Sequence, residues 1–177
     1  GWLAWAKNGK AAGTSGYAYR LEAIQIVVTA KGDMAPTVFY GGYTSNNAKA
    51  YISKTSTVPI INTNASVRYQ SHVSNIGWQN AVADGALAGT IGRALNVEAI
   101  NMSLTGEMAN QYDIYYRVHA QNYGWLGWAK NGQNAGTSGQ NLHLEALQIV
   151  LVKKGQSAPG NNYGGIISKN TMAYIAR

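Results

Sequence analysis

One pattern of residues occurs three times along this chain, and an internal repeat constrains the fold more than any local feature does. The occurrences are GWLAWAKNGKAAGTSGYAYRLEAIQIVV from Gly1, GWQNAVADGALAGTIGRALNVEAINMSL from Gly77 and GWLGWAKNGQNAGTSGQNLHLEALQIVL from Gly124. They share Gly-Trp, then Asn/Asp-Gly, then Ala-Gly-Thr-x-Gly, and finally Leu/Val-Glu-Ala-Ile/Leu at the start of an apolar run. We therefore expect three similar structural units, named copies one, two and three.

Copies one and three are also related over a longer stretch. Gly1 and Gly124 are 123 residues apart, and the match at this offset continues without a gap to the end of the chain. A lead-in precedes copies two and three, at Tyr69–Asn75 and Tyr116–Asn122, whereas the sequence begins at the Gly-Trp of copy one. We expect the N-terminus to lie inside a structural unit of a longer array.

The two periods divide the chain into five segments. They are copy one without its lead-in (1–32), a tail and linker (33–66), copy two (67–106), copy three (107–155) and a tail that matches 33–54 (156–177).

Composition indicates a globular protein and excludes several classes of function. Of the 177 residues, 46% are apolar and 12% charged, as in a chain that can bury a core. The absence of Cys excludes disulfides and zinc-thiolate sites. No apolar run is long enough for a spanning helix, so we expect no membrane span. The net charge of +7 comes from basic residues spread along the chain, which argues against nucleic acid and fits weak attraction to anionic wall polymers.

The local patterns predict β-strands and tight turns. Tyr116–Asn122 alternates apolar and polar residues, as in a half-buried strand. Asn131-Gly132 is a strong hairpin signal, Ala-Gly-Thr-x-Gly is expected to be a loop or wide turn, and the apolar run after the Glu is expected to be a strand covered on both faces. We therefore predict an all-β fold with about three strands per copy. The copies could form a β-prism-like or barrel-like threefold or a linear row, and the incomplete copy one argues against closure by this chain alone.

The combined motif resembles a known repeat family. Tyr-x-x-His-x-x-Asn-x-Gly-Trp, Asp/Asn-Gly, Ala-Gly-Thr-x-Gly and Leu-Glu-Ala-Ile together are similar to the clostridial hydrophobic repeat with a conserved tryptophan, the ChW repeat, in three tandem copies. The resemblance implies an exported Gram-positive protein, secreted or on the cell surface, and an accessory module that binds glycans or proteins. Copy two departs from the pattern at Ala81, where copies one and three have Trp, and at Asn96, where the family favours a basic residue.

Tryptophans occupy two positions of the repeat. The first position is filled in every copy, and we expect these side chains to pack in the core: Trp2, Trp78 and Trp125. The second position is filled by Trp5 and Trp128 but by Ala81 in copy two. Trp5 and Trp128 are therefore candidates for contact with a sugar ring, with packing against a neighbouring unit as the alternative.

One acidic position recurs in all copies, as Glu22, Glu98 and Glu145. A carboxylate on an apolar strand needs a partner. Arg20 and His143, two residues before the Glu, or the amides of the Ala-Gly-Thr-x-Gly loop could supply it, and hydrogen bonding to sugar hydroxyls is the functional alternative. His72 and His119 occupy equivalent lead-in positions and are expected to be structural, because one His and one Glu per copy are too few for a metal site.

These observations predict a binding module without catalytic residues, metal or cofactor. Glycoside hydrolysis usually needs paired carboxylates, and only one acid recurs, whereas repeated weak sites raise avidity. We expect binding of glycan or cell-wall polymer, or of a protein, through Trp5, Trp128, Glu22, Glu98 and Glu145. The alternative is a structural protein that assembles head to tail into filaments or layers, with another chain completing the strand edge that copy one leaves bare.

Overall fold

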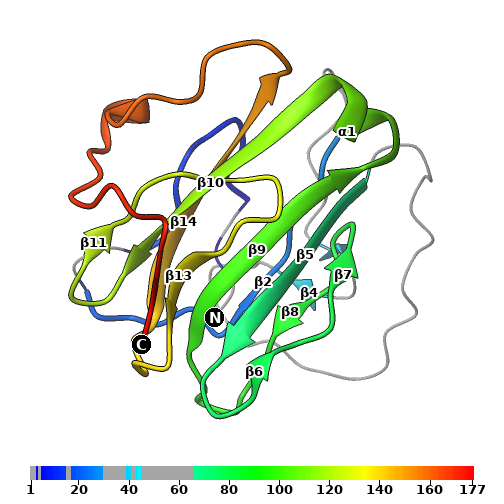
Figure 1. Cartoon of the computed structure of the whole chain (residues 1–177). Helices are drawn as coiled ribbons and strands as arrows, with labels where there is room; N and C mark the ends of the chain where they lie inside the picture. Colours follow the sequence, from blue (N-terminus) through cyan, green and yellow to red (C-terminus); the bar gives the residue numbers. More distant parts are fainter. Residues whose placement is uncertain (1–2, 4, 15–16, 30–38, 41–42, 45–65) are drawn as a thin grey trace.

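A computed structural model describes residues 3, 5–14, 17–29, 39–40, 43–44 and 66–177, which form an almost entirely β fold (Figure 1). The elements of copy one and its tail are β1 (Ala12–Gly13), β2 (Ala23–Ile24), β3 (Phe39–Tyr40) and β4 (Tyr43–Thr44). Copy two contains β5 (Ser66–Val73), β6 (Gly77–Trp78), β7 (Val82–Ala83), β8 (Ala88–Gly89) and β9 (Val97–Thr105). Helix α1 (Gly106–Gln111) leads to β10 (Tyr112–Ala120), β11 (Gly124–Trp125), β12 (Ala129–Lys130), β13 (Ala135–Ser138) and β14 (Leu144–Lys153). The second tail holds the 3₁₀ turn η1 (Tyr163–Gly165) and β15 (Tyr174–Ala176). The all-β prediction is confirmed.

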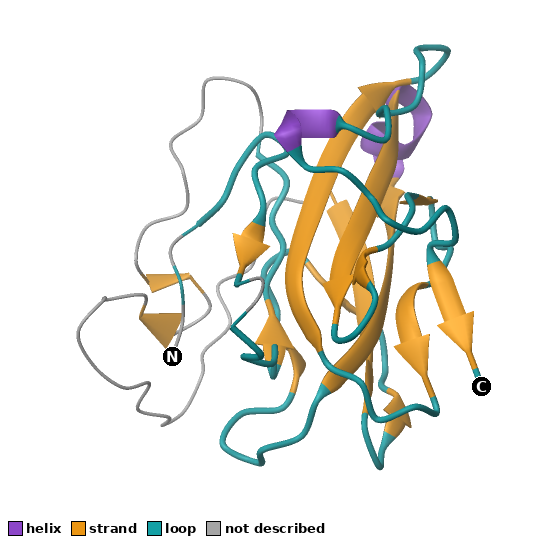
Figure 2. Cartoon of the chain, turned by 90° about the vertical axis from the view of Figure 1, so that its left-hand side faces the viewer, coloured by secondary structure: helices purple, strands orange, loops and turns teal. Residues whose placement is uncertain are grey.

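Copies two and three have the same internal plan. The lead-in is a long strand that pairs antiparallel with the last strand of its copy, β5 with β9 and β10 with β14. Two short strands then fold back on the lead-in, β6 and β7 on β5, and β11 and β12 on β10. Figure 2 shows the long strands side by side in the body of the molecule. The lead-in with alternating residues and the apolar run after the glutamate therefore both form strands, as predicted.

The Asn/Asp-Gly dipeptides form tight turns, as predicted. Asn131 and Gly132 have φ of 45° and 89°, and Asp84 and Gly85 have 47° and 86°; these positive values are the ones that a two-residue hairpin requires. The Oδ1 of Asn131 also accepts a hydrogen bond of 2.9 Å from the backbone N–H of Ile114. The turn residue thus has a second role, because it fixes the start of the lead-in strand.

The Ala-Gly-Thr segments form short strands, and the prediction of a loop was wrong. Each one pairs with the last strand of a different copy: β1 with β14, β8 with β2, and β13 with β9. Copy one thus joins copy three, copy two joins copy one, and copy three joins copy two. The three junctions therefore link the copies in a closed ring, as in the β-prism-like alternative and unlike a linear row. The missing lead-in does not prevent closure, because the joining strands lie elsewhere in each copy.

A glycine makes each of these junctions possible. Gly13, Gly89 and Gly136 have φ of 112°, 121° and 121°, values that side chains rarely allow. A Cβ at Gly136 would lie 2.4 Å from the backbone carbonyl oxygen of Glu98. The Ala-Gly-Thr motif therefore recurs because two backbones approach closely at this point.

The core lies between the sheets and contains residues of all three copies. It includes Ile24 of copy one, Ile100 of copy two and Leu147 of copy three. The buried tyrosine of each lead-in connects two copies: the Tyr116 hydroxyl donates to the Gln133 carbonyl and accepts from the Met102 N–H at 3.1 Å. Burial raises the pKa of Tyr116 to about 12, so this hydroxyl keeps its donating proton.

Two further elements, α1 and β15, complete the second half of the chain. The six-residue α1 joins β9 to β10, although the sequence shows no helical periodicity. The tail ends in β15, which contains the Tyr-Ile of Ala173-Tyr174-Ile175 and pairs in parallel with β13. The corresponding Ala50-Tyr51-Ile52 lies outside the described residues.

Candidate functional site

Copies two and three each hold a row of three side chains across neighbouring strands. In copy two, Trp78 of β6 pairs with His72 of β5, with ring centres 5.4 Å apart in an edge-to-face arrangement. The Nδ1 of His72 lies 2.9 Å from the Oε2 of Glu98 on β9. Copy three repeats the row with Trp125, His119 and Glu145, at 5.6 Å between rings and 2.9 Å from Nδ1 to Oε2.

A β-bulge brings each glutamate to its histidine. The register of β5 and β9 pairs His72 with Ala99 and Val73 with Val97, so it skips Glu98, and the register of β10 and β14 skips Glu145 in the same way. A bulge turns the extra residue away from strict alternation. For this reason, the glutamate contacts the lead-in histidine and not only the aliphatic residues that follow it.

The glutamates have cationic or imidazole partners, as expected, but their exposure differs. Arg20 donates to the Oε1 of Glu22 at 3.0 and 3.1 Å, and His143 Nε2 lies 3.5 Å from the Oε1 of Glu145. The side chain of Glu22 is 31% exposed, against 3% for Glu98 and 6% for Glu145. Only Glu22 is therefore open to a ligand.

The imidazole contacts are close but not well-directed hydrogen bonds. Nδ1 of His72, Nδ1 of His119 and Nε2 of His143 have no partner in hydrogen-bond geometry, although the first two lie 2.9 Å from a carboxylate oxygen. Each imidazole nitrogen is thus near a carboxylate oxygen without a directed hydrogen bond to it. The alternative partner, the loop amides, binds elsewhere: the N–H of Thr14 donates to the backbone carbonyl of Glu145 at 2.8 Å.

In copies two and three, the tryptophan at the first position lies outside the buried core. Trp78 is 36% exposed and Trp125 is half-buried, because both rings lie on the histidine side of their sheets. The prediction of core packing was wrong for Trp78. Trp2 lies outside the described residues.

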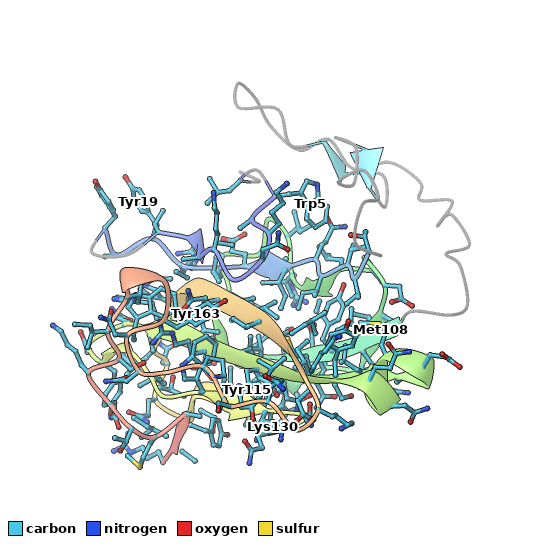
Figure 3. The ribbon with its side chains drawn as sticks, turned by 90° about the horizontal axis from the view of Figure 1, so that it is seen from above. Trp5, Tyr19, Met108, Tyr115, Lys130 and Tyr163 are labelled. Atoms are coloured by element: carbon cyan, nitrogen blue, oxygen red, sulfur yellow. The ribbon has the colours of Figure 1, made fainter. Side chains whose placement is uncertain are left out.

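The second tryptophan position packs against the tail in copy three. The Nε1 of Trp128 donates to the Gly160 carbonyl at 3.2 Å, and its ring meets that of Tyr163 edge to face at 5.9 Å. The residue thus contacts its own tail, and its predicted contact with a sugar stays a prediction. Trp5, at the same position of copy one, is half-buried (Figure 3).

Arg117 is a structural centre that the sequence analysis missed. It is fully buried, and its guanidinium donates to Gln148, to Ser168 and to three tail carbonyls, those of Asn161, Tyr163 and Ile166. The guanidinium carbon lies 4.5 Å from the centre of the Trp128 ring. Copy two has Gln70 here, Ala81 in place of Trp128 and no tail. Copy two thus lacks the arginine, the tryptophan and the tail at once, and this joint absence was a sequence signal that the three contact one another.

A charged cluster stabilises the start of the same lead-in. Asp113 accepts hydrogen bonds from Lys130 and Lys154 at 2.8 and 2.9 Å and from Asn131 at 2.8 Å. These donors, Lys130 foremost, hold the pKa of Asp113 well below its ordinary value. Asp113 in turn raises the pKa of Lys130, whose ammonium also lies over the ring of Tyr115 (Figure 3).

Among the described residues, the most exposed aromatic pair lies in copy one, beside Glu22. Tyr17 and Tyr19 are 71% and 67% exposed, with ring centres 6.2 Å apart and planes inclined by 18°. Figure 3 shows Tyr19 projecting from the outside of the N-terminal copy. The Arg20 and Glu22 ion pair next to them supplies hydrogen-bond donors and acceptors. Sequence analysis missed these tyrosines because the other copies have Arg93 and Gln140, or Leu95 and Leu142, at their positions.

The described residues limit the chemistry of these sites. No group of three or more acidic, histidine or cysteine side chains among them could hold a metal ion. An open pocket of about 440 Å³ is lined by Tyr123, Gln140, Leu142, Ile175, Ala176 and Arg177 and includes none of the predicted site residues. In this part of the chain, no helix is long and apolar enough to cross a membrane.

Comparison with known proteins agrees with the repeat. The sequence profile of the family described as clostridial hydrophobic W (ChW) matches residues 1–30, 72–106 and 119–153. No curated protein and no solved structure gave a match. The three matched segments together cover more than half of the chain, and each contains the Gly-Trp that opens a copy and its Leu/Val-Glu-Ala motif. This chain therefore belongs to the ChW family, with three copies of its repeat.

Proposed function

We propose that this chain is a non-catalytic module that binds glycan or cell-wall polymer outside a Gram-positive cell. The observation that carries the proposal is the exposed stack of Tyr17 and Tyr19 beside the Arg20 and Glu22 ion pair. An aromatic surface can cover the apolar face of a sugar ring, while adjacent charged groups bond its hydroxyls. Glu22 thus remains a ligand-binding candidate, whereas the burial of Glu98 and Glu145 favours a structural role for them.

A non-catalytic role is supported by the surroundings of three acidic side chains, those of Glu98, Glu145 and Asp113. Hydrolysis of a glycosidic bond needs two carboxylates that flank it. Glu98 and Glu145 are buried beside histidines, and Asp113 is held by two lysines. None of these three is available to flank a substrate.

Weak attraction to anionic polymer and repetition both favour binding over catalysis. The net charge of +7 attracts polymers such as anionic wall glycans. The partly exposed Trp78 offers a second, weaker aromatic surface in copy two. Several weak sites on one polymer raise the overall affinity without any new contact, and the family's clostridial description supports a Gram-positive source.

The test replaces the tyrosines by residues that the same fold already accepts. In Tyr17→Gln with Tyr19→Leu, copy one receives the side chains of copy three, Gln140 and Leu142. We expect about tenfold weaker binding to purified wall glycan in titration calorimetry, since each aromatic contact contributes roughly 0.5–1.5 kcal/mol. Ile167→Ala, at an exposed apolar position of the tail, should leave the affinity unchanged. Equal affinity of the double variant and the unchanged protein would contradict the assignment.

A further inference from the structure

We propose that the outer face of the copy-two sheet is a second binding site, which takes an oligosaccharide whose sugars carry carboxylates. The outer face consists of Arg68, Gln70 and His72 on β5, Trp78 on β6 and Asn101 on β9. This second site deepens the proposed function and rests on it, because it belongs to the same glycan-binding module.

Strand alternation and register place these five side chains on one side of the sheet. His72 lies opposite Trp78, and Gln70 lies opposite Asn101; residues that are opposite in a ladder share a face. Arg68 is exposed, and Gln70 and His72 are partly exposed. The residues of β5 that alternate with them are buried: Val67, Tyr69, Ser71 and Val73. The polar side chains of β5 therefore face away from the core.

The same face of copy three is covered by the tail. There, Arg117 is fully buried and donates to three tail carbonyls, and its guanidinium carbon lies 4.5 Å from the centre of the Trp128 ring. Copy two has Gln70 and Ala81 at the positions of Arg117 and Trp128, and no tail follows it before copy three begins. Because Gln70 is partly exposed whereas Arg117 is not, the face that is closed in copy three is accessible in copy two.

The polar groups beside Trp78 are available to a ligand. In the part of the chain that the structure describes, the side chains of Arg68 and Gln70 have no hydrogen-bond or ion-pair partner. Gln70 lies near Trp78, since the guanidinium carbon of its counterpart Arg117 is 5.4 Å from the ring centre of Trp125, the counterpart of Trp78. An amide next to an aromatic ring can both donate to and accept from the hydroxyls of a sugar that stacks on the ring.

Trp78 is a rigid aromatic platform. It is 36% exposed, and its ring meets that of His72 edge to face at 5.4 Å between centres. The Nδ1 of His72 lies in turn 2.9 Å from the Oε2 of the buried Glu98. These contacts hold the ring in place, which lowers the entropy cost of binding a sugar to it. A Cβ added at Gly77 would meet no atom within 4 Å outside the adjacent residues, so there is open space beside the platform.

Arg68 gives the outer face its preference for an acidic ligand. A guanidinium can bind a carboxylate through two parallel hydrogen bonds, and Arg68 is exposed. Two acidic side chains of copy two are engaged elsewhere, Glu98 with His72 and Asp84 with the N–H of Val67 at 3.0 Å. Four residues of extended strand separate Arg68 from His72, about 13 Å. The stacked sugar and the sugar that carries the carboxylate are therefore different units of one oligosaccharide.

The test uses a defined acidic oligosaccharide and its uncharged counterpart. The probe is tetragalacturonic acid, and its methyl ester is a control of nearly the same size. Titration calorimetry is carried out with Tyr17→Gln plus Tyr19→Leu, so that the tyrosine site of copy one does not contribute. We expect the acid to bind and to shift the amide NMR signals of Gln70 and Asn101. The ester should bind at least about threefold more weakly, since it cannot form the ion pair with Arg68.

Three further variants in the same background separate binding from folding, which circular dichroism verifies for each. Trp78→Ala should weaken binding of the acid about tenfold. Ala81→Trp, the residue of copies one and three, should weaken it by filling the space beside Gln70. Ala83 is exposed and lies opposite Arg68. Ala83→Lys, again the residue of the other copies, should tighten binding of the acid about threefold and leave that of the ester unchanged. A purely structural face would not gain affinity in this way.

Four results would overturn the second site. They are loss of acid binding in Tyr17→Gln plus Tyr19→Leu, equal affinities for acid and ester, no gain in Ala83→Lys, and a dimer in light scattering that Trp78→Ala dissociates, since the face would then bind a second copy. The proposed function is scored separately, because purified wall glycan tests the two tyrosines with the outer face intact. Either site can therefore fail while the other stands.

Discussion

Gly136 illustrates how a single residue fixes the junction between two copies. Its φ is 121°, and a Cβ would lie 2.4 Å from the Glu98 carbonyl oxygen. Gly132 also has a positive φ, 89°, but a Cβ there would have no atom within 4 Å. The two glycines therefore separate the effect of backbone conformation from the effect of close approach.

We predict that Gly136→Ala is much more destabilising than Gly132→Ala. Backbone strain alone should lower the free energy of unfolding by about 1–3 kcal/mol in both variants. In Gly136→Ala the clash with the β9 backbone adds to this loss, because backbone cannot move aside as a flexible side chain can. Urea denaturation at neutral pH measures both values. Similar losses in the two variants would mean that the strands do not approach as closely as described.

Asp113 makes the stability of copy three depend on pH. Its pKa in the folded protein is lowered by Lys130, Asn131 and Lys154 from an ordinary 3.8. A group with a lowered folded pKa stabilises the fold above its unfolded pKa and loses this contribution as the pH falls through the folded pKa. We predict that the unchanged protein loses more stability below about pH 4 than Asp113→Asn does. Urea unfolding of both proteins at pH 7 and pH 2.5 measures the difference, and parallel losses would contradict it.

The sequence identified single residues better than their partners. Asn131 and Gly132 were predicted correctly because a turn with positive φ depends on adjacent residues only. Arg20 and His143 were predicted as partners of a glutamate because each lies two positions before it in the sequence. His72 and His119 were not, because their contact with glutamate depends on a bulge that alternation does not reveal.

At the scale of elements, the tail and β10 are held together by one side chain. Arg117 projects from β10 and donates to three carbonyls of the tail, while Trp128 covers it. The guanidinium needs the tail carbonyls as acceptors, since a buried guanidinium without acceptors is costly. The tail carbonyls in turn have this guanidinium as their donor. The sequence indicated this dependence only through its absence from copy two.

We predict that Arg117→Gln releases the tail and leaves the sheets folded. The variant has the copy-two residue, Gln70, and its tail carbonyls lose their donor; we expect a loss of ~3 kcal/mol in the free energy of unfolding. Limited trypsin digestion should then cleave faster after Lys169 in the tail. Gln70→Ala, at the same position of a copy without a tail, is the control and should leave that cleavage rate unchanged. A tail as resistant in Arg117→Gln as in the unchanged protein would refute the role of Arg117.

At the scale of the molecule, the closed ring follows from three strands that the sequence analysis treated as loops. Ala12 pairs with Leu147, Ala88 with Ile24, and Ala135 with Ile100. Strands of two to four residues have no recognisable periodicity, and the pairing of Ala12 with Leu147 joins distant parts of the chain. Local patterns therefore predicted the strands within each copy but not how the copies are joined.

Closure makes a specific prediction about copies one and three. Gly13 lies at their junction, where a Cβ would be 2.3 Å from the Glu145 carbonyl oxygen. In a ring, Gly13→Ala should lower the stability of the whole molecule in a single transition, as Gly89→Ala and Gly136→Ala should, because all three junctions close one core. In a row, copies one and three would not touch, and Gly13→Ala would leave the exchange protection of β14 unchanged. Urea unfolding followed by tryptophan fluorescence and circular dichroism, with amide exchange at Leu147, separates the two. Coincident transitions with weakened protection at this amide are the expected result, because Leu147 pairs with Ala12 of β1, which belongs to copy one.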